Sequence, residues 1–206
     1  MDTVINGDIT IGPGGDPKTI VHVHEETNSS YTGSIIVADE PKELPPVVPE
    51  GTSLGSLVIP SGESVVHPGG TYRFDSIQMD SDSTLEFTGP VTLYVDGSIN
   101  IYAGNIKTAS DLPGNLIINA SAQHPFNSDP TGTINIYTVN PLYAAIYAPE
   151  TSVSIAGSQE FYGAVVGLHV VLDLPGGGGA YYDEALSDLG GGDGNTAVNM
   201  IAWWEP

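Results

Sequence analysis

A nineteen-residue repeat towards the C-terminal end limits the possible fold more than any other feature. The segment LYAAIYAPETSVSIAGSQE begins at Leu142 and is followed directly by FYGAVVGLHVVLDLPGGGG from Phe161, and AYYDEAL begins at Ala180. Repeats of this length are typical of solenoids, in which each copy buries its apolar face on the next. The alignment places three tyrosines in one column, Tyr143, Tyr162 and Tyr181, and pairs Leu142 with Phe161, Ile146 with Val165, Val153 with Leu172 and Ile155 with Leu174.

Elsewhere the apolar residues recur with a period of two, which indicates strands and not helices. Twenty-six glycines and sixteen prolines divide the chain into short segments. The clearest runs are Ile9/Ile11, Val21/Val23, Ile35/Val37, Leu57/Ile59, Tyr72/Phe74, Ile77/Met79, Leu85/Phe87, Val91/Leu93/Val95, Ile99/Ile101, Leu116/Ile118 and Ile134/Ile136. We therefore predict an all-β fold, a right-handed parallel β-helix (β-solenoid), over an antiparallel jelly roll, which would not produce matched columns at the length of one rung.

Prolines divide the chain into three predicted parts. Residues 40–53 carry four prolines among acidic residues, a composition typical of an extended linker. We expect an N-terminal β segment over residues 1–39 and the β-solenoid domain over residues 54–206. The apolar residues 198–204 are predicted to form a capping strand, because the open end of a solenoid needs cover.

The charge of the chain excludes several classes of partner. Four basic residues stand against twenty-five acidic ones, which gives a formal net charge of −21. Without a basic stripe to neutralise phosphates, we expect no nucleic acid partner and no contact of this fragment with a membrane. Cysteine is absent, so disulfides and thiolate zinc sites are excluded. The acidic surface is either a solvated surface alone or one that attracts calcium; we expect no required cofactor.

Two pairs of side chains are candidate metal ligands. His22 and His24 alternate along a predicted strand, which places them on one face at the spacing of a two-histidine site. Such a site needs a third ligand, and paired histidines on a strand are more often ordinary polar residues. Asp80 and Asp82 could supply calcium with oxygen ligands, although the segment lacks the loop of an EF-hand. The alternative interpretation of these two aspartates is the corner of a rung.

Enzymatic function finds little support in the motifs. The chain has no HExxH helix or P-loop. A lyase for acidic sugars needs cationic groups, which are scarce here, whereas a β-helical hydrolase of neutral glycans needs only two carboxylates and stays open as the alternative. The adjacent Asp183 and Glu184 would point to opposite sides of a strand, so we interpret them as turn or cap residues. We predict that the chain is not an enzyme.

Five motifs follow one another in an order that resembles a known family. They are PGGTYRFDSIQM from Pro68, GPVTLYVDGSINI from Gly89, AAIYAPETSVSIAG from Ala144, FYGAVVG from Phe161 and YYDEAL from Tyr181. Over residues 54–206 this succession resembles the C-terminal domain of PilX-like pilus-assembly proteins and is similar to choice-of-anchor A surface proteins of bacteria. The closing IAWWEP looks like the tryptophan-bearing end of that family.

The resemblance implies an exported, β-helix-like domain, often behind a prepilin-type helix, with no accepted catalytic residues. YYDEAL replaces the commoner HYDEAL, which removes the basis for a histidine-dependent role of this motif. We therefore expect a non-enzymatic structural or adhesive module of a bacterial pilus-associated or cell-surface protein. Its expected location is extracellular or on the cell surface, with the export signal outside this fragment. Its expected partners are pilus subunits or surface ligands.

Overall fold

Short parallel strands stack into a β-solenoid of about five turns, which confirms the predicted fold class. The computed structural model describes residues 4–5, 9–20, 30–40, 44–122, 133–174 and 179–181. Within these residues the helical content is one α-helical turn, α1 (Pro17–Ile20), and one 3-10 turn, η1 (Pro113–Asn115). In the part of the chain that the structure describes, no helix is long and apolar enough to cross a membrane.

Each of the first three rungs contains three strands. In chain order these are β5 (Ser56–Ile59), β6 (Ser64–His67) and β7 (Gly70–Phe74); β8 (Ser76–Met79), β9 (Thr84–Phe87) and β10 (Val91–Val95); β11 (Ile99–Tyr102), β12 (Asn105–Thr108) and β13 (Leu116–Ala120). The later strands are β14 (Ile134–Thr138), the long β15 (Leu142–Gly157) and β16 (Phe161–Asp173), and β17 (Ala180–Tyr181). Every pairing between rungs is parallel.

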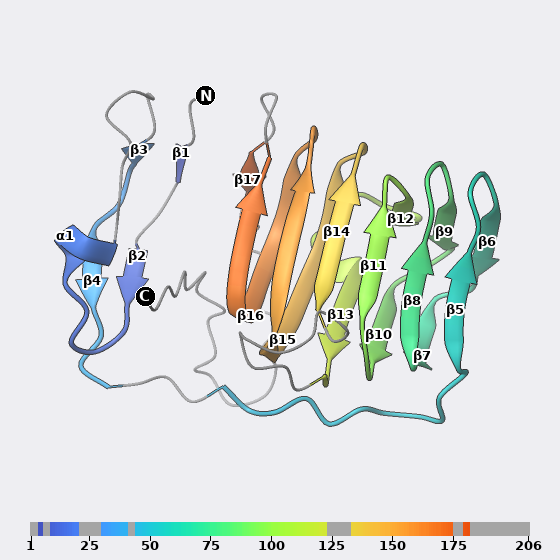
Figure 1. Ribbon diagram of the computed structural model, residues 1–206, viewed down its shortest axis with the longest axis horizontal. Coiled ribbons are helices and arrows are strands. Elements are labelled where there is room, and N and C mark those ends of the chain that lie inside the picture. Colours follow the sequence, from blue (N-terminus) through green and yellow to red (C-terminus); the bar gives the residue numbers. More distant parts are fainter. Residues whose placement is uncertain are drawn as a thin grey trace.

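The strands form three walls around one core (Figure 1). The front sheet contains β5, β8, β11 and β14 and continues into the second halves of β15 and β16. The back sheet contains β7, β10 and β13 and continues into the first halves of β15 and β16. A third sheet contains β6, β9 and β12. In Figure 1 the chain rises along the front strands, descends behind them and advances from right to left, so the solenoid is right-handed.

Alternation of side chains fills the core with stacked apolar columns. Along β10 and β13 the residues alternate between buried and half-buried, and along β14 between buried and exposed. β15 alternates in the same way on either side of Ala148 and Pro149, which are both buried. Ile77, Ile99, Ile134 and Val153 lie in one column of the front sheet, each almost fully buried. Each rung covers the apolar side chains of the next, which is why one rung alone would not be stable.

The pairing predicted from the nineteen-residue repeat is confirmed in the back sheet and is wrong in the front sheet. Tyr143 pairs with Tyr162 and Tyr162 with Tyr181, as the alignment predicts. Beyond Ala148, however, Val153 pairs with Val170 and not with Leu172. Ile155 likewise pairs with Leu172 and not with Leu174. A β-bulge between Ala148 and Ser152 shifts the register by two residues. Because a shift of two keeps every side chain on its own face, the period-two pattern could not reveal it.

The N-terminal part forms small parallel sheets of its own. β1 (Val4–Ile5) pairs with β3 (Ser30–Tyr31), and β2 (Ile9–Ile11) pairs with β4 (Ile35–Val37). The proline-rich residues 44–53 then run without helix or strand along the solenoid to β5 (Figure 1). We call residues 44–53 the strap. The predicted capping strand, residues 198–204, lies outside the described residues.

Candidate functional site

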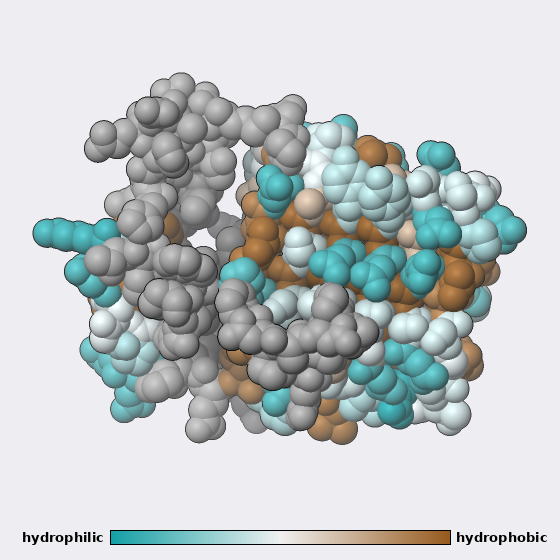
Figure 2. Space-filling model, in the orientation of Figure 1, coloured by the Kyte–Doolittle hydropathy of each residue, from teal (hydrophilic) through white to brown (hydrophobic). Residues whose placement is uncertain are grey.

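The outward side of the front sheet carries a polar ladder that repeats from rung to rung. Asn100 pairs with Gln78 on one side and with Asn135 on the other, and Asn135 pairs with Ser154. A parallel column of hydroxyl side chains includes Ser56 and Ser76, whose Oγ atoms are hydrogen-bonded at 2.9 Å. Figure 2 shows hydrophilic residues in a row across this face of the solenoid. We use the name polar ladder for Gln78, Asn100, Asn135 and Ser154.

The polar ladder is uncharged in a strongly acidic protein. The outward residues of β5, β8, β11 and β14 are Ser56, Val58, Ser76, Gln78, Asn100, Tyr102, Asn135 and Tyr137. None of these eight residues carries a charge, whereas the chain as a whole has a formal net charge of −21. The composition of the face therefore favours hydrogen bonding and aromatic contacts over ion pairing.

Two tyrosines project beside the ladder from neighbouring rungs. Tyr102 pairs with Tyr137 in the register of β11 and β14, and their rings stack with centroids 5.7 Å apart and planes 23° apart. Both remain open to solvent, Tyr102 with 67% and Tyr137 with 43% of its surface exposed. Large aromatic rings left this exposed at neighbouring positions are candidates for contact with a ligand.

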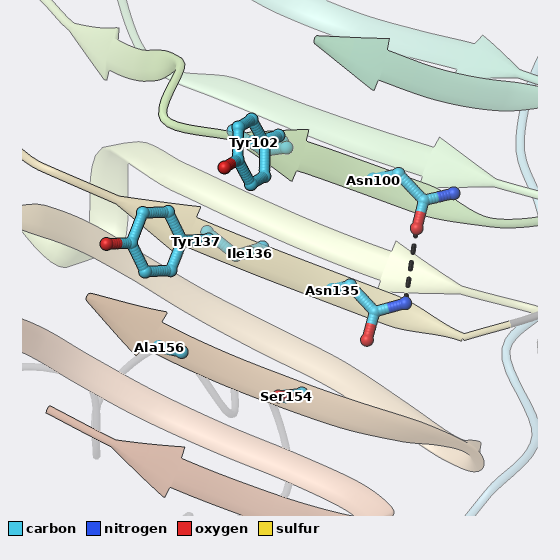
Figure 3. Close-up of a pocket in the computed structure, with 8 residues that line it drawn as sticks. Asn100, Tyr102, Asn135, Ile136, Tyr137, Ser154 and Ala156 are labelled. Carbon is cyan, nitrogen blue, oxygen red and sulfur yellow. Dashed lines mark hydrogen bonds between the residues drawn. The ribbon is translucent and has the colours of Figure 1, made fainter. Parts of the chain in front are cut away.

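A shallow depression of about 190 Å³ lies where the aromatic column ends. On the next rung Tyr137 is paired with Ala156, whose small side chain cannot cover the tyrosine ring. The depression is lined by Asn100, Ile101, Tyr102, Asn135, Ile136, Tyr137, Ser154 and Ala156 (Figure 3). Its wall thus combines aromatic faces with amide and hydroxyl groups, and one carboxylate, the exposed Asp173 of β16, is paired with Ala156 at its edge.

The two amides are held by hydrogen bonds along and across the strands. Asn135 Nδ2 donates to Asn100 Oδ1 at 3.2 Å and to Thr133 Oγ1 at 2.7 Å (Figure 3). Both amides are exposed. The two amides therefore hold each other across neighbouring rungs, and Thr133 holds Asn135 along its own rung.

The strap is anchored across the outward side of the back sheet. Tyr147 donates a hydrogen bond from its phenol to the Pro45 carbonyl oxygen at 2.7 Å. Arg73 Nη1 donates to the Gly51 carbonyl oxygen at 3.1 Å. Burial raises the pKa of Tyr147, and burial followed by the charge and hydrogen bonding of the Glu50 carboxylate raises the pKa of Tyr94.

Arg73 also joins the first two rungs through an ion pair. Its Nη2 lies 2.9 Å from Asp96 Oδ2, and its Nε donates to both carboxylate oxygens of Asp96, at 3.2 and 3.0 Å. A second ion pair, Lys107 with Glu86 at 3.1 Å, joins β12 to β9 on the third sheet. Neither cation lies on the strands that carry the polar ladder.

A second aromatic column follows the repeat on the back sheet. The rings of Tyr143 and Tyr162 stack at 4.7 Å and 5°, and those of Tyr162 and Tyr181 at 5.0 Å and 19°. The pKa of Tyr162 is raised first by burial, then by the charge of Glu160 and then by the two neighbouring tyrosines. The column is a continuous stack, so it offers no gap like the one beside Ala156.

The candidate metal ligands divide between the described and the undescribed parts of the chain. Asp80 and Asp82 lie at the corner between β8 and β9, where Asp82 has a positive φ of 60° and the Ser83 backbone N–H donates to the Asp80 carbonyl oxygen. His22 and His24 lie outside the described residues, as do Asp183 and Glu184. Among the residues that the structure describes, no group of three or more histidine, aspartate or glutamate side chains gathers in a way that could hold a metal ion. Calcium binding at Asp80 and Asp82 stays a prediction.

The residues of the depression were missed by sequence reasoning, although a signal for them is present. The tetrapeptide INIY occurs at residues 99–102 and again at residues 134–137. Its two copies pair residue for residue in β11 and β14. They are separated by more than one ordinary rung because η1 and the residues after β13 intervene, and this spacing hid the repeat from a search at nineteen residues.

Comparison with known proteins finds one family. The family described as "Domain of unknown function (DUF7305)" matches residues 75–189, which is more than half of the chain. No curated protein and no solved structure matches the chain. The matched range begins at the start of β8 and includes the polar ladder, both INIY tetrapeptides and the back-sheet tyrosine column.

Proposed function

The chain belongs to the DUF7305 family of domains of unknown function, and from the site geometry we propose that it is a non-enzymatic structural and adhesive module. It serves as a rigid rod of a bacterial pilus-associated or cell-surface protein, with the front sheet as the surface that meets a partner. The observation that supports the proposal is the polar ladder: Gln78, Asn100 and Asn135 repeat one amide per rung along the uncharged outward side of β8, β11 and β14.

A solenoid suits this role for a physical reason. Parallel strands pair on the front sheet from β5 to β16, so outward side chains recur at about 4.8 Å intervals along the axis. Repetition multiplies weak contacts, because contacts made by one rigid body share a single loss of rotational and translational freedom. The resemblance to PilX-like and choice-of-anchor A proteins supports display on the bacterial surface.

The alternative is a hydrolase of neutral glycans. Hydrolysis needs two carboxyl groups about 5–10 Å apart across the bond to be cleaved. The depression, which is the candidate cleft in the described part of the chain, is lined by amide, hydroxyl, phenol and apolar groups. Adhesion therefore accounts for its composition better than hydrolysis does.

Adhesion and turnover are tested on the same preparation. The purified chain is coupled to beads, and bead retention is measured under flow on glass, mica and glycan-coated surfaces, with heat-unfolded chain as the control. In parallel, the release of reducing ends is measured after incubation with neutral and acidic polysaccharides. Retention without turnover is the expected result. Turnover of any polysaccharide would overturn the proposal and favour the hydrolase.

Display of the domain on a pilus or on the cell surface is tested separately, by sequencing the reading frame upstream of Met1. A prepilin-type leader with an apolar helix would support a pilus component. A cleavable signal alone would favour a free secreted or cell-wall protein.

A further inference from the structure

We propose that the depression beside Tyr137 and Ala156 binds a neutral oligosaccharide. This inference rests on the proposed adhesive function and deepens it, because it names the class of ligand that the front sheet holds. Tyr137 is the stacking platform, and Asn100 and Asn135 are the hydrogen-bonding groups.

The aromatic contribution comes from one uncovered ring face. The ring of Tyr137 is stacked against Tyr102 on one side, at 5.7 Å, and on the other side its strand neighbour is Ala156. The open face is electron-rich, whereas the C–H face of a pyranose ring is apolar and weakly positive. A sugar ring placed over Ala156 would therefore extend the aromatic stack by one step.

The polar contribution comes from atoms that the protein leaves available. Asn135 Nδ2 donates its two hydrogens to Asn100 and Thr133. The Asn135 Oδ1 acceptor and the Asn100 Nδ2 donors make no hydrogen bond to another residue that the structure describes, and Figure 3 shows them pointing away from each other. Sugar hydroxyls both donate and accept, so one acceptor and one donor group on adjacent rungs suit them.

The stacking also sets the direction of the sugar chain. Tyr102 and Tyr137 stack from rung to rung, so a sugar ring on the open face of Tyr137 lies across the solenoid axis. The glycosidic bonds of a linear glycan lie near the planes of its rings, so the oligosaccharide runs along the strands and not along the axis. From Ala156 this direction leads to Ser154 on β15, which is paired with Asn135.

Two other ligand classes fit less well. A polyanion would be repelled by a chain of net charge −21, and neither Arg73 nor Lys107 lies on the strands of the ladder. A peptide that adds a strand needs unpaired backbone groups, whereas β11 and β14 are paired on both sides. The site thus offers a ligand side-chain groups and no unpaired backbone groups. A neutral sugar binds through side-chain groups of this kind.

The test titrates the full chain with three hexamers and follows backbone and asparagine side-chain amide signals by NMR. The probes are cellohexaose, chitohexaose and, as the anionic comparison, hexagalacturonate. Because the depression is shallow, we expect a Kd of about 1 mM for at least one neutral hexamer and no shifts with hexagalacturonate. The shifted signals are expected at residues 99–102 and 134–137.

Three variants assign the shifts to the site. Tyr137→Ala removes the stacking face and should weaken binding about tenfold. Tyr181→Ala, which removes a tyrosine of similar exposure (45%) from the back sheet, should leave binding unchanged. Ala156→Leu fills the depression without removing any contact of the core and should abolish the shifts. It therefore keeps the test decisive if Tyr137→Ala unfolds the chain.

The outcomes separate this inference from the proposed function. Shifts that neither Tyr137→Ala nor Ala156→Leu reduces, or the absence of shifts with both neutral hexamers, would overturn the saccharide site. If the beads then still adhere, the adhesive function stands without it. Binding of an extended polar peptide at residues 99–102 and 134–137 in place of both hexamers would also overturn the inference. Binding accompanied by cleavage of the hexamer would keep the site and overturn the non-enzymatic function.

Discussion

Tyr147 donates its phenolic hydrogen to the carbonyl oxygen of Pro45 at 2.7 Å, although the two residues are 102 positions apart. Tyr147 lies on β15 and Pro45 on the strap. Arg73 holds the strap at Gly51 near the other end of the solenoid. Two back-sheet strands, β10 and β13, lie between these anchors, so the strap spans four rungs of the solenoid.

Removing the Tyr147 hydroxyl should loosen the strap. Tyr147→Phe leaves the Pro45 carbonyl without its donor, and we expect a loss of about 0.5–1.5 kcal/mol in the free energy of unfolding. Cleavage after Glu50 by a glutamate-specific protease should become faster, because the strap leaves the surface more often. Tyr102→Phe, on the front sheet, is the matched control and should change neither quantity. Equal protease rates for Tyr147→Phe and the parent chain would contradict the anchoring role.

The ion pair of Arg73 and Asp96 should contribute more than the pair of Lys107 and Glu86. The side chains of the first pair are 31% and 29% exposed, and those of the second are 46% and 36% exposed. Double-mutant cycles with Arg73→Gln/Asp96→Asn and Lys107→Gln/Glu86→Gln measure each coupling energy. We expect about 1 kcal/mol for the first pair and less than about 0.5 kcal/mol for the second, both weaker at high salt. A larger coupling for the second pair would show that exposure does not set the order.

Close approach of neighbouring rungs requires glycine at position 163. Gly163 has a φ of +148°, and an added Cβ would meet the carbonyl oxygen of Ala144 on the adjacent rung. Gly163→Ala should therefore lower the free energy of unfolding by about 2–5 kcal/mol. The control is Gly62→Ala, where φ is +75° and the Cβ meets nothing within 4 Å, so that only backbone strain of about 1 kcal/mol is expected. Similar losses in both variants, measured by urea unfolding, would argue against a steric cause.

Three half-buried tyrosines should make the fold sensitive to alkali. The pKa of Tyr162 is raised by burial first, and those of Tyr94 and Tyr147 are raised as well. The folded chain therefore keeps phenolic protons that the unfolded chain loses near pH 10. Stability contributed by these groups is present below about pH 10 and is lost as the pH rises through the folded pKa values.

This dependence is measured by recording phenolate absorbance and urea unfolding from pH 8 to 12. We expect part of the tyrosine absorbance to titrate above pH 10 and the midpoint of unfolding to fall over the same range. Tyr162→Phe should remove one of the late-titrating groups. Complete titration at the ordinary tyrosine pKa in the folded chain would contradict the prediction.

Calcium binding at the corner of Asp80 and Asp82 is open to a direct test. If both carboxylates ligate calcium, the melting temperature should be higher in excess calcium than in chelator. Asp82→Asn should then reduce this difference, because asparagine tolerates the positive φ of 60° but lacks the charge. Equal melting temperatures in calcium and chelator would count against the site.

The fold class could be predicted from the sequence alone, because period-two alternation and a repeat are local properties of the chain. The column of Tyr143, Tyr162 and Tyr181 was predicted correctly, since both of its pairings join residues that are nineteen positions apart. The pairing of Val153 failed at a bulge that shifts the register by two residues. Both registers bury the same face, so hydrophobic alternation could not distinguish them.

The candidate site was decided by tertiary structure. Asn100 and Asn135 are 35 residues apart and hydrogen-bond only because the intervening chain completes one turn of the solenoid. The depression exists because Tyr137 is set beside Ala156, a pairing that depends on the register between β14 and β15. The strap likewise reaches Tyr147 only in the folded chain. Composition and periodicity determined that the chain stacks rungs, whereas the register of those rungs, set by packing across the whole core, decided which side chains meet.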